Sequence, residues 1–317
     1  MKFALDEQQR DFAASIDAAL GAADLPGAVR AWAAGDTAPG RKVWEQLANL
    51  GVTALSVPEK FDGIEAHPID LVVALERLGR WCVPGPVVES IAVAPVLLAS
   101  DDHAERCAAL ASGALIATVA LPPRVPRAVD ADMAGLVLLA GLNGTDGVAE
   151  AAAGDEHESV DPSRHLFDVT AAGPAWEADV NRAYEFGALA TAAQLIGAAE
   201  ALRDAAVDYA KQRTQFGRVI GSYQAIKHKL ADVHVAIELA RPLVHGAALT
   251  LNPRDVSAAK AAASEAGLLA ARSALQTHGA IGFTQEHDLS LLLLRVQALR
   301  SAWGTPAQHR RRVLEAL

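Results

Sequence analysis

An apolar seam in the C-terminal third constrains the fold more than any other feature of the sequence. Successive members are separated by 4, 3, 4, 3 and 4 residues: Ile226, Leu230, Val233, Ile237, Ala240 and Val244. This spacing places them on one face of an α-helix and is typical of helices packed in a bundle. Hydrophobic residues make up 51% of the chain but aromatic residues only 5%, which favours close-packed helices over a β-sandwich. We therefore expect a mainly α fold.

Changes in residue pattern divide the 317 residues into three regions. Residues 1–112 and 179–317 carry helical periodicity, and we expect an N-terminal helical domain and a C-terminal four-helix bundle. Residues 113–178 are expected to form a reduced β middle domain, because short apolar runs alternate there with Pro-, Gly- and acid-rich loops. The expected strands lie within 114–121, 136–141 and 165–170. About 65 residues suffice for a small sheet and little more.

Helix-terminating residues give local predictions in the C-terminal region. Ser222 follows a glycine and precedes the seam, so we expect it to cap the N-terminus of that helix. Gly279 follows a long Ala-rich stretch and is expected to end a helix. The last helix is expected to start with Thr305 as its N-cap, Pro306 at its first position and Gln308 closing a capping box.

Charge and cysteine content argue against several classes of protein. The formal net charge is −10 with acidic residues spread along the chain, whereas nucleic-acid-binding proteins carry a basic stripe. The apolar stretch at 186–199 is too short and too rich in small residues to span a bilayer. The first residues turn acidic and polar at once, unlike a signal peptide, so we expect a cytoplasmic location. Cys82 and Cys107 lack CxxC spacing and are expected to be buried thiols.

Common catalytic motifs are missing from the sequence. No Glu has a His three residues later, which a di-iron helix bundle needs, so no metal site is expected. The patterns GxxxxGK[ST], GxGxxG, GxSxG and HExxH do not occur. The sequence therefore does not support a phosphate loop, a Rossmann site, a serine hydrolase or a zincin.

One connection between two helical stretches, KQRTQFGRVIGSYQ at 211–224, is richer in chemistry than a linker needs to be. Arg213 offers a planar fork for a phosphate, and Phe216 offers an apolar face for a ring. Gly217 allows close backbone approach, and the following helix N-terminus favours negative charge. These residues would suit the pyrophosphate and adenosine of a dinucleotide. They are equally consistent with a solvated turn whose Phe216 is tucked into the core.

Three segments resemble the acyl-CoA dehydrogenase family. Residues 209–233 (YAKQRTQFGRVIGSYQAIKHKLADV) contain its Arg-x-x-Phe-Gly motif with the later Gln, and residues 275–299 (LQTHGAIGFTQEHDLSLLLLRVQAL) resemble its Gln-x-x-Gly-Gly-x-Gly-Phe segment. Residues 57–80 are similar to its Val-Pro-Glu turn and Glu-x-Leu-Gly helix. The resemblance implies a helical domain, a small β-domain and a four-helix bundle, with FAD at a dimer interface.

In that family one subunit's β-domain holds the flavin ring, while the neighbour's bundle holds the pyrophosphate and adenosine. The resemblance therefore implies FAD contacts across a subunit boundary from Arg213, Gln215, Phe216, Gln224, Gln276 and Gly279. Ala280 stands where the family has its second glycine, which leaves the closest backbone approach there open.

The resemblance also implies α,β-desaturation of an acyl-CoA thioester, in which a Glu removes the α-proton and the β-hydride passes to flavin N5. That Glu usually precedes Gly-Thr before the last helix, but Trp303 stands there, and an indole has no basic group. A subset of the family places its base at the position of Gly187. Glu185, two residues away, is rotated by about 200° and would point to the opposite side. We therefore expect no catalytic base in this chain.

The middle region also departs from the family. Residues 113–178 lack the Thr-Glu-Pro-Gly loop and the Trp-Ile-Thr-Asn strand that hold the flavin ring. The chain therefore resembles the short non-catalytic β subunit of actinobacterial α2β2 steroid-CoA dehydrogenases. Its partner would be a longer catalytic subunit that shares FAD and binds the acyl-CoA, with an electron-transfer flavoprotein as acceptor. Two alternatives stay open: an intact homomeric acyl-CoA dehydrogenase with Glu185 as its base, and a flavin-free scaffold or CoA-ester-binding module.

Overall fold

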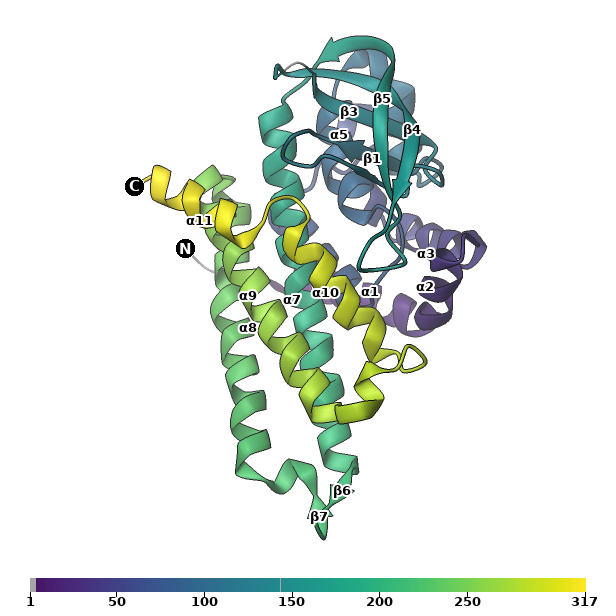
Figure 1. Cartoon of the computed structure of the whole chain (residues 1–317). Helices are drawn as coiled ribbons and strands as arrows, with labels where there is room; N and C mark the ends of the chain where they lie inside the picture. Colours follow the sequence, from purple (N-terminus) through teal and green to yellow (C-terminus); the bar gives the residue numbers. More distant parts are fainter. Residues whose placement is uncertain (1–3, 143) are drawn as a thin grey trace.

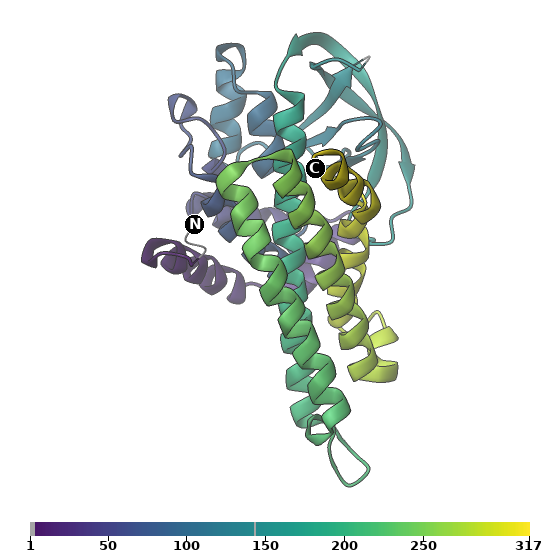
Figure 2. The same cartoon turned by 90° about the vertical axis from the view of Figure 1, so that its left-hand side faces the viewer.

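Long helices and a small sheet make up the chain, which we describe from a computed structural model covering residues 4–142 and 144–317. The prediction of a mainly α fold with a small sheet is confirmed. Figure 1 shows the sheet at one end of the molecule and the long helices running away from it, and in Figure 2 the same helices end in a projecting hairpin. The elements change type near residues 112 and 178, while the division into three domains stays a prediction.

The N-terminal region is a set of short helices around a common apolar core. Its α-helices are α1 (Glu7–Gly21), α2 (Leu25–Ala33), α3 (Ala38–Asn49), α4 (Pro68–Arg80), α5 (Ala94–Leu97) and α6 (Ala104–Ala111). Short 3-10 turns lie at Val52–Ala54, Glu59–Phe61 and Asp101–His103, and a π-helical turn at Glu89–Val93 leads into α5. The π-helical turn buries the carboxylate of Glu89.

The middle region holds a five-stranded sheet in the order β1-β3-β4-β5-β2. Its strands are β1 (Ala117–Ala120), β2 (Ala128–Val129), β3 (Leu136–Leu142), β4 (Gly147–His157) and β5 (Leu166–Glu177). β1 pairs with β3 in parallel and the other pairs are antiparallel. The three expected strands exist, but the sequence reading took β4 for a loop. Residues 152–156, in the second half of β4, are exposed. The sequence GVAEAAAGDEH therefore lacks the apolar alternation that marks a half-buried strand.

The C-terminal region is a helix bundle built around one long central helix. Its helices are α7 (Val180–Gln212), α8 (Gln224–Thr250), α9 (Pro253–His278), α10 (Leu289–Ser301) and α11 (Pro306–Glu315). The seam prediction is confirmed: its six residues lie on α8, five of them buried and Ile226 partly buried. α7 packs against α8, α9 and α10 and, on its other side, against α4 of the N-terminal region.

The contact between α4 and α7 depends on glycine. A Cβ atom on Gly197 of α7 would lie 1.8 Å from the carbonyl oxygen of Glu76, and one on Gly79 of α4 would lie 2.2 Å from that of Gln194. Neither position can therefore hold a side chain without moving a helix. Glycine at both positions therefore lets the backbones of α4 and α7 touch.

Most of the local predictions hold, with one correction. Gly279 ends α9, and Thr305 and Gln308 form the expected capping box at α11. The N-cap prediction for Ser222 is wrong: α8 begins at Gln224, and the Ser222 hydroxyl donates to the Val219 carbonyl 2.7 Å away, inside a 3-10 turn (Ile220–Ser222). Because this hydroxyl already donates within the turn that precedes α8, it does not cap the helix.

The cysteine prediction is confirmed, since Cys82 and Cys107 are both buried and free. Among residues 4–142 and 144–317, no helix combines the length and the apolar character that crossing a bilayer would need.

Candidate functional site

The connection between α7 and α8 is a hairpin whose tip presents an aromatic ring to solvent. β6 (Thr214–Gln215) pairs with β7 (Arg218–Val219), and the two tip residues, Phe216 and Gly217, have φ of 52° and 80°. A two-residue hairpin loop of this kind requires left-handed backbone at both positions. Phe216 is 91% exposed, so the alternative that tucks it into the core is wrong. A bulky residue with φ above zero costs about 1–3 kcal/mol, and such strain is concentrated at ligand sites.

The hairpin is held in shape from its own base. The Tyr223 hydroxyl lies 3.4 Å from the carbonyl oxygens of both Gln215 and Phe216, and the Arg218 guanidinium stacks 4.0 Å above the Tyr223 ring. The backbone N–H of Ile220 donates to the Arg213 carbonyl at 2.8 Å. Because these contacts fix the loop without Phe216 or the Arg213 side chain, both groups stay available for a ligand.

Arg213 is an exposed cation. Its guanidinium makes no hydrogen bond or ion pair with any other residue of the described chain, 4–142 and 144–317. By contrast, Lys211 nearby pairs with Asp208 at 3.4 Å. An unpaired guanidinium next to an exposed phenyl ring and a helix N-terminus matches what a phosphate-linked aromatic ligand requires.

The end of α9 lies beside this hairpin and carries the second predicted segment. Lys229 of α8 donates to the Gln276 side chain on α9. Tyr209, one turn before Arg213, stacks on His278 with ring centroids 4.3 Å apart. Residues 209–224 and 276–283 therefore meet at one end of the bundle, and we call this surface the bundle-end site.

Gly279 in the bundle-end site has φ 66° and ψ −139°, a conformation that essentially only glycine adopts. No heavy atom lies within 4 Å of where a Cβ would stand on Gly279 or Gly217, so a ligand can approach both backbones. Phe283, in the 3-10 turn Gly279–Phe283 that follows α9, is 76% exposed and adds a second aromatic ring. Gln215 donates to the neighbouring Thr214 carbonyl, and Gln224 is exposed at the start of α8.

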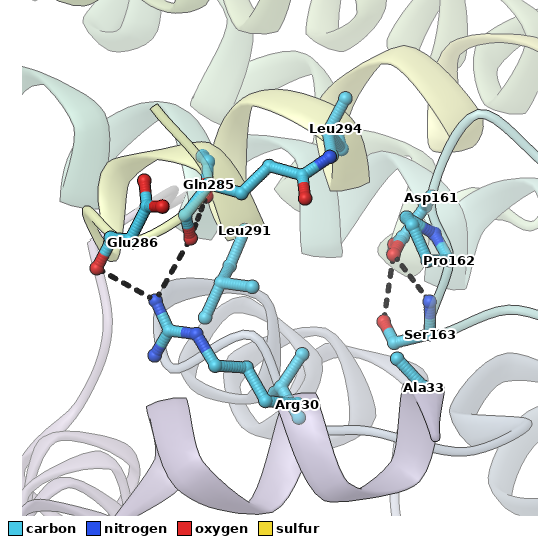
Figure 3. A pocket seen from close by; sticks show the side chains of 11 residues that line it. Arg30, Ala33, Asp161, Pro162, Ser163, Gln285, Glu286, Leu291 and Leu294 are labelled. Atoms are coloured by element: carbon cyan, nitrogen blue, oxygen red, sulfur yellow. Dashed lines mark hydrogen bonds between the residues drawn. The ribbon is translucent and has the colours of Figure 1, made fainter. Parts of the chain in front are cut away.

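An arginine from the N-terminal region holds the loop that follows. Figure 3 shows Arg30 of α2 reaching the carbonyl oxygens of Gln285 and Glu286, at 3.3 and 3.2 Å, and its other terminal nitrogen lies 2.7 Å from Asp288. The cavity beside it, about 320 Å³, has mostly apolar walls. Its buried carboxylate, Asp161, is already paired, so we assign no ligand to this cavity.

Trp303 and Gly187, the two positions at which the resemblance predicts a base, pack directly against each other. The Trp303 ring is fully buried, and a Cβ on Gly187 would lie 2.3 Å from it. The Trp303 carbonyl accepts a hydrogen bond from Tyr184 at 3.2 Å and lies 2.8 Å from His309 Nε2. The indole N–H donates to the Glu89 carboxylate at 2.9 Å. Neither a tryptophan ring nor a glycine can accept a proton, so the prediction that these two positions carry no base stays a prediction.

Glu185 faces a different set of residues. Its carboxylate pairs with Arg312 of α11, and burial raises its pKa against the opposing effect of that arginine. Glu89, which does touch Trp303, was missed by the sequence reading. The signal for it was a single acid inside the apolar run VVESIAVA, which pattern analysis treats as an ordinary helix residue.

The fold is that of a flavoprotein of the acyl-CoA dehydrogenase type. Family profiles described as the N-terminal and C-terminal domains of acyl-CoA dehydrogenase match residues 6–109 and 178–317. The chain belongs to the acyl-CoA dehydrogenase family, whose members use FAD. It is 33% identical to the acyl-CoA dehydrogenase IpdE2 of Mycolicibacterium smegmatis over 293 residues, covering 91% of this chain and 92% of that protein.

Solved structures share the fold. The Tcur3481-Tcur3483 steroid ACAD variant superposes with a TM-score of 0.83 at 20% identity, covering 98% of this chain and 97% of that one. The ChsE4-ChsE5 complex from Mycobacterium tuberculosis gives 0.83 at 21% identity, covering 99% and 98%. At this identity the likeness concerns the fold alone.

The bundle-end site fits the adenosine and pyrophosphate part of FAD. Arg213 is unpaired, Phe216 is held exposed in a strained backbone, and Gly217 and Gly279 leave their surroundings open. These are the features that a phosphate and an aromatic base need.

Proposed function

We propose that this chain is the non-catalytic subunit of a heteromeric FAD-dependent acyl-CoA dehydrogenase. One contrast supports the proposal most directly. The bundle-end site keeps Arg213 and Phe216 unpaired and exposed, whereas Trp303 and Gly187 close the place where a base would act. A homomeric enzyme would need both halves in one chain. The partner would be a longer homologous subunit that carries the base, in an α2β2 assembly.

The residues of this chain would hold the cofactor rather than the substrate. Arg213 would bind the pyrophosphate bidentately, Phe216 would cover the adenine ring, and the N-terminus of α8 at Gln224 would favour the negative charge. Gln276 and Gly279 would complete the contacts from α9. FAD supplies the hydride acceptor, and the partner would supply the flavin-ring site and the carboxylate that removes the α-proton.

The substrate is proposed to be an acyl-CoA thioester of steroid origin, with an electron-transfer flavoprotein as electron acceptor. The name of one structural neighbour describes a steroid ACAD, which supports this substrate class without identifying the acyl group. The acyl pocket would belong mainly to the partner, because the partner would carry the base, whereas this chain has the fully buried Trp303 at the position that the resemblance gives to it.

Purification with and without the partner subunit tests the proposal. The chain alone is expected to be colourless and inactive, while the complex is expected to be yellow and to oxidise acyl-CoA. Arg213→Ala should lower the flavin content of the complex, whereas Lys211→Ala, a matched removal of a nearby exposed cation, should leave it nearly unchanged. A yellow, active homo-oligomer of this chain would contradict the proposal, and unchanged flavin in the Arg213→Ala complex would favour a flavin-free scaffold.

A further inference from the structure

Three rings from three separate segments stack together next to Gly279. Tyr209 of α7 and His278, the last residue of α9, have ring centroids 4.3 Å apart and planes inclined by 23°. His287, in the loop that leads into α10, meets the His278 ring edge-on at 5.3 Å. His278 is only 5% exposed and directly precedes Gly279, whose backbone a ligand can approach. A buried titratable ring therefore adjoins the backbone that we assign to the cofactor.

One nitrogen of the His278 ring is bound to the protein and the other is not. Nδ1 lies 2.9 Å from the Ala274 carbonyl oxygen, which can only accept, so Nδ1 carries a proton. Nε2 forms no hydrogen bond with any residue in the ranges 4–142 and 144–317. Burial lowers the pKa of His278, and the Ala274 carbonyl opposes this effect. The ring is therefore mainly neutral at neutral pH, and an added proton would bind at Nε2.

Several cations lie around the stack. Lys229 of α8 donates to a side chain in the last turn of α9, and Arg213 follows Tyr209 by one turn. A positive charge on His287 would oppose a second one on His278. A proton on His278 would thus add to charge of the same sign, although the C-terminus of α9 favours a cation at this position.

The nearby acids do not neutralise His278. Asp208 of α7 pairs with a lysine of the same helix at 3.4 Å, and Asp288 pairs with Arg30 at 2.7 Å. Glu286 is exposed to solvent. Within the part of the chain that the structure describes, His278 forms no ion pair. An anion that stabilises its protonated form must therefore come from a ligand.

We propose that His278 makes the flavin affinity of the bundle-end site depend on pH, because the bound pyrophosphate favours the protonated ring. This inference rests on the proposed function, in which Arg213 and Gly279 hold that pyrophosphate. Coupling between two ligands is reciprocal, so a cofactor that favours proton binding is itself bound more tightly when the proton is present. Flavin affinity should therefore rise as pH falls through the range in which histidine titrates, from about 7 to 5.

Titration of the flavin-free complex with FAD at several pH values, followed by flavin fluorescence, tests this dependence. The phosphates of FAD are diesters and do not change their charge in this range. Wild type should bind FAD about threefold more tightly at about pH 5.5 than at about pH 8, as expected for charges several ångströms apart near a protein surface. His278→Asn keeps a donor for the Ala274 carbonyl and cannot titrate, so its affinity should be nearly independent of pH.

His234→Asn is the matched control, because His234 is an exposed histidine of α8 whose ring lies 3.1 Å from Arg203. This variant should keep the dependence of the wild type. His287→Asn keeps an acceptor for the backbone N–H of Leu289, which His287 Nδ1 now accepts at 3.1 Å, and removes a like charge from His278. The rise in affinity should then begin at a higher pH, which keeps the proposal testable if His278→Asn does not fold.

A pH dependence that His278→Asn leaves unchanged would overturn the proposal, and so would a wild-type affinity that is constant or falls as pH falls. If His278→Asn does not fold, an unchanged midpoint in His287→Asn has the same consequence. The proposed function is tested separately by Arg213→Ala. Unchanged flavin in that variant would contradict both the cofactor site and the role of His278. Loss of flavin there, combined with an unaltered pH profile in His278→Asn, would contradict the role of His278 alone.

Discussion

Replacing Phe216 by Asn should make the isolated chain more stable and the complex a poorer flavin binder. Phe216 is 91% exposed, so its removal loses almost no buried apolar area. Its φ of 52° is unfavourable for Phe, whereas Asn-Gly is a preferred pair for a two-residue hairpin loop. Relief of this strain should raise the free energy of unfolding by about 1 kcal/mol. For a chain of this size that is a rise in Tm of roughly 2 °C.

The same change should act in the opposite direction on the cofactor. Stacking of an aromatic side chain on a base contributes about 1–3 kcal/mol, so FAD affinity should fall by roughly 5- to 150-fold. Differential scanning calorimetry of the flavin-free chain gives the first quantity, and flavin retained after dialysis of the complex gives the second. Gly217→Ala is the matched change in the same turn. It should destabilise the chain by about 1 kcal/mol, because Gly217 also has φ above zero.

A loss of stability in Phe216→Asn would refute the reasoning, because it would mean that the ring packs on this chain after all. Unchanged flavin affinity would refute the assignment of Phe216 to the cofactor, while leaving the argument about strain intact.

Three further changes test the interior of the molecule. Gly187→Ala should destabilise the chain by about 1–3 kcal/mol in denaturant unfolding, because its Cβ would meet the Trp303 ring at 2.3 Å; a neutral result would mean that the two elements separate easily. Glu185→Gln should leave the activity of the complex unchanged while costing about 1 kcal/mol through its partly exposed pair with Arg312; a large loss of activity would revive Glu185 as a base. Asp130 has a folded pKa of about 7, above its ordinary value of 3.8, so the folded state binds an extra proton in this window and its contribution to stability is lost as pH rises from about 4 to 7. Asp130→Asn should flatten that part of the stability profile, and an unchanged slope would contradict the raised pKa.

The sequence predicts those parts of the fold whose signal is local. The apolar seam placed α8 correctly because a buried helix face repeats every three or four residues. β4 could not be recognised in this way, because its exposed half has no reason to alternate. The N-cap prediction for Ser222 was wrong because its hydroxyl donates to the Val219 carbonyl of the preceding turn instead of accepting from the first backbone N–H groups of α8. This choice depends on the three-dimensional turn and has no signal in the sequence.

In the candidate site, too, some features have a local signal in the sequence and others do not. Arg213 and Phe216 could be selected from sequence, since a cation, an aromatic and a glycine in one connection are unusual together. The left-handed backbone at Phe216 could not, because it follows from pairing of the two short strands. The contact between Glu89 and Trp303 joins residues 214 positions apart and has no local signal.

Because the backbones of α4 and α7 touch, a small change of angle at this contact moves the hairpin at the far end of α7. From Gly197, where α7 rests on α4, to the end of α7 is 15 residues, or about 23 Å of helix. Along such an arm a tilt of one degree moves the tip by about 0.4 Å, comparable with the whole permitted range of an N–H···O distance. A methyl group at Gly197, 1.8 Å from the Glu76 carbonyl, would force a larger tilt than that. The alignment of the hairpin therefore depends on the contact between Gly197 and Glu76, which lies about 23 Å of helix away from it.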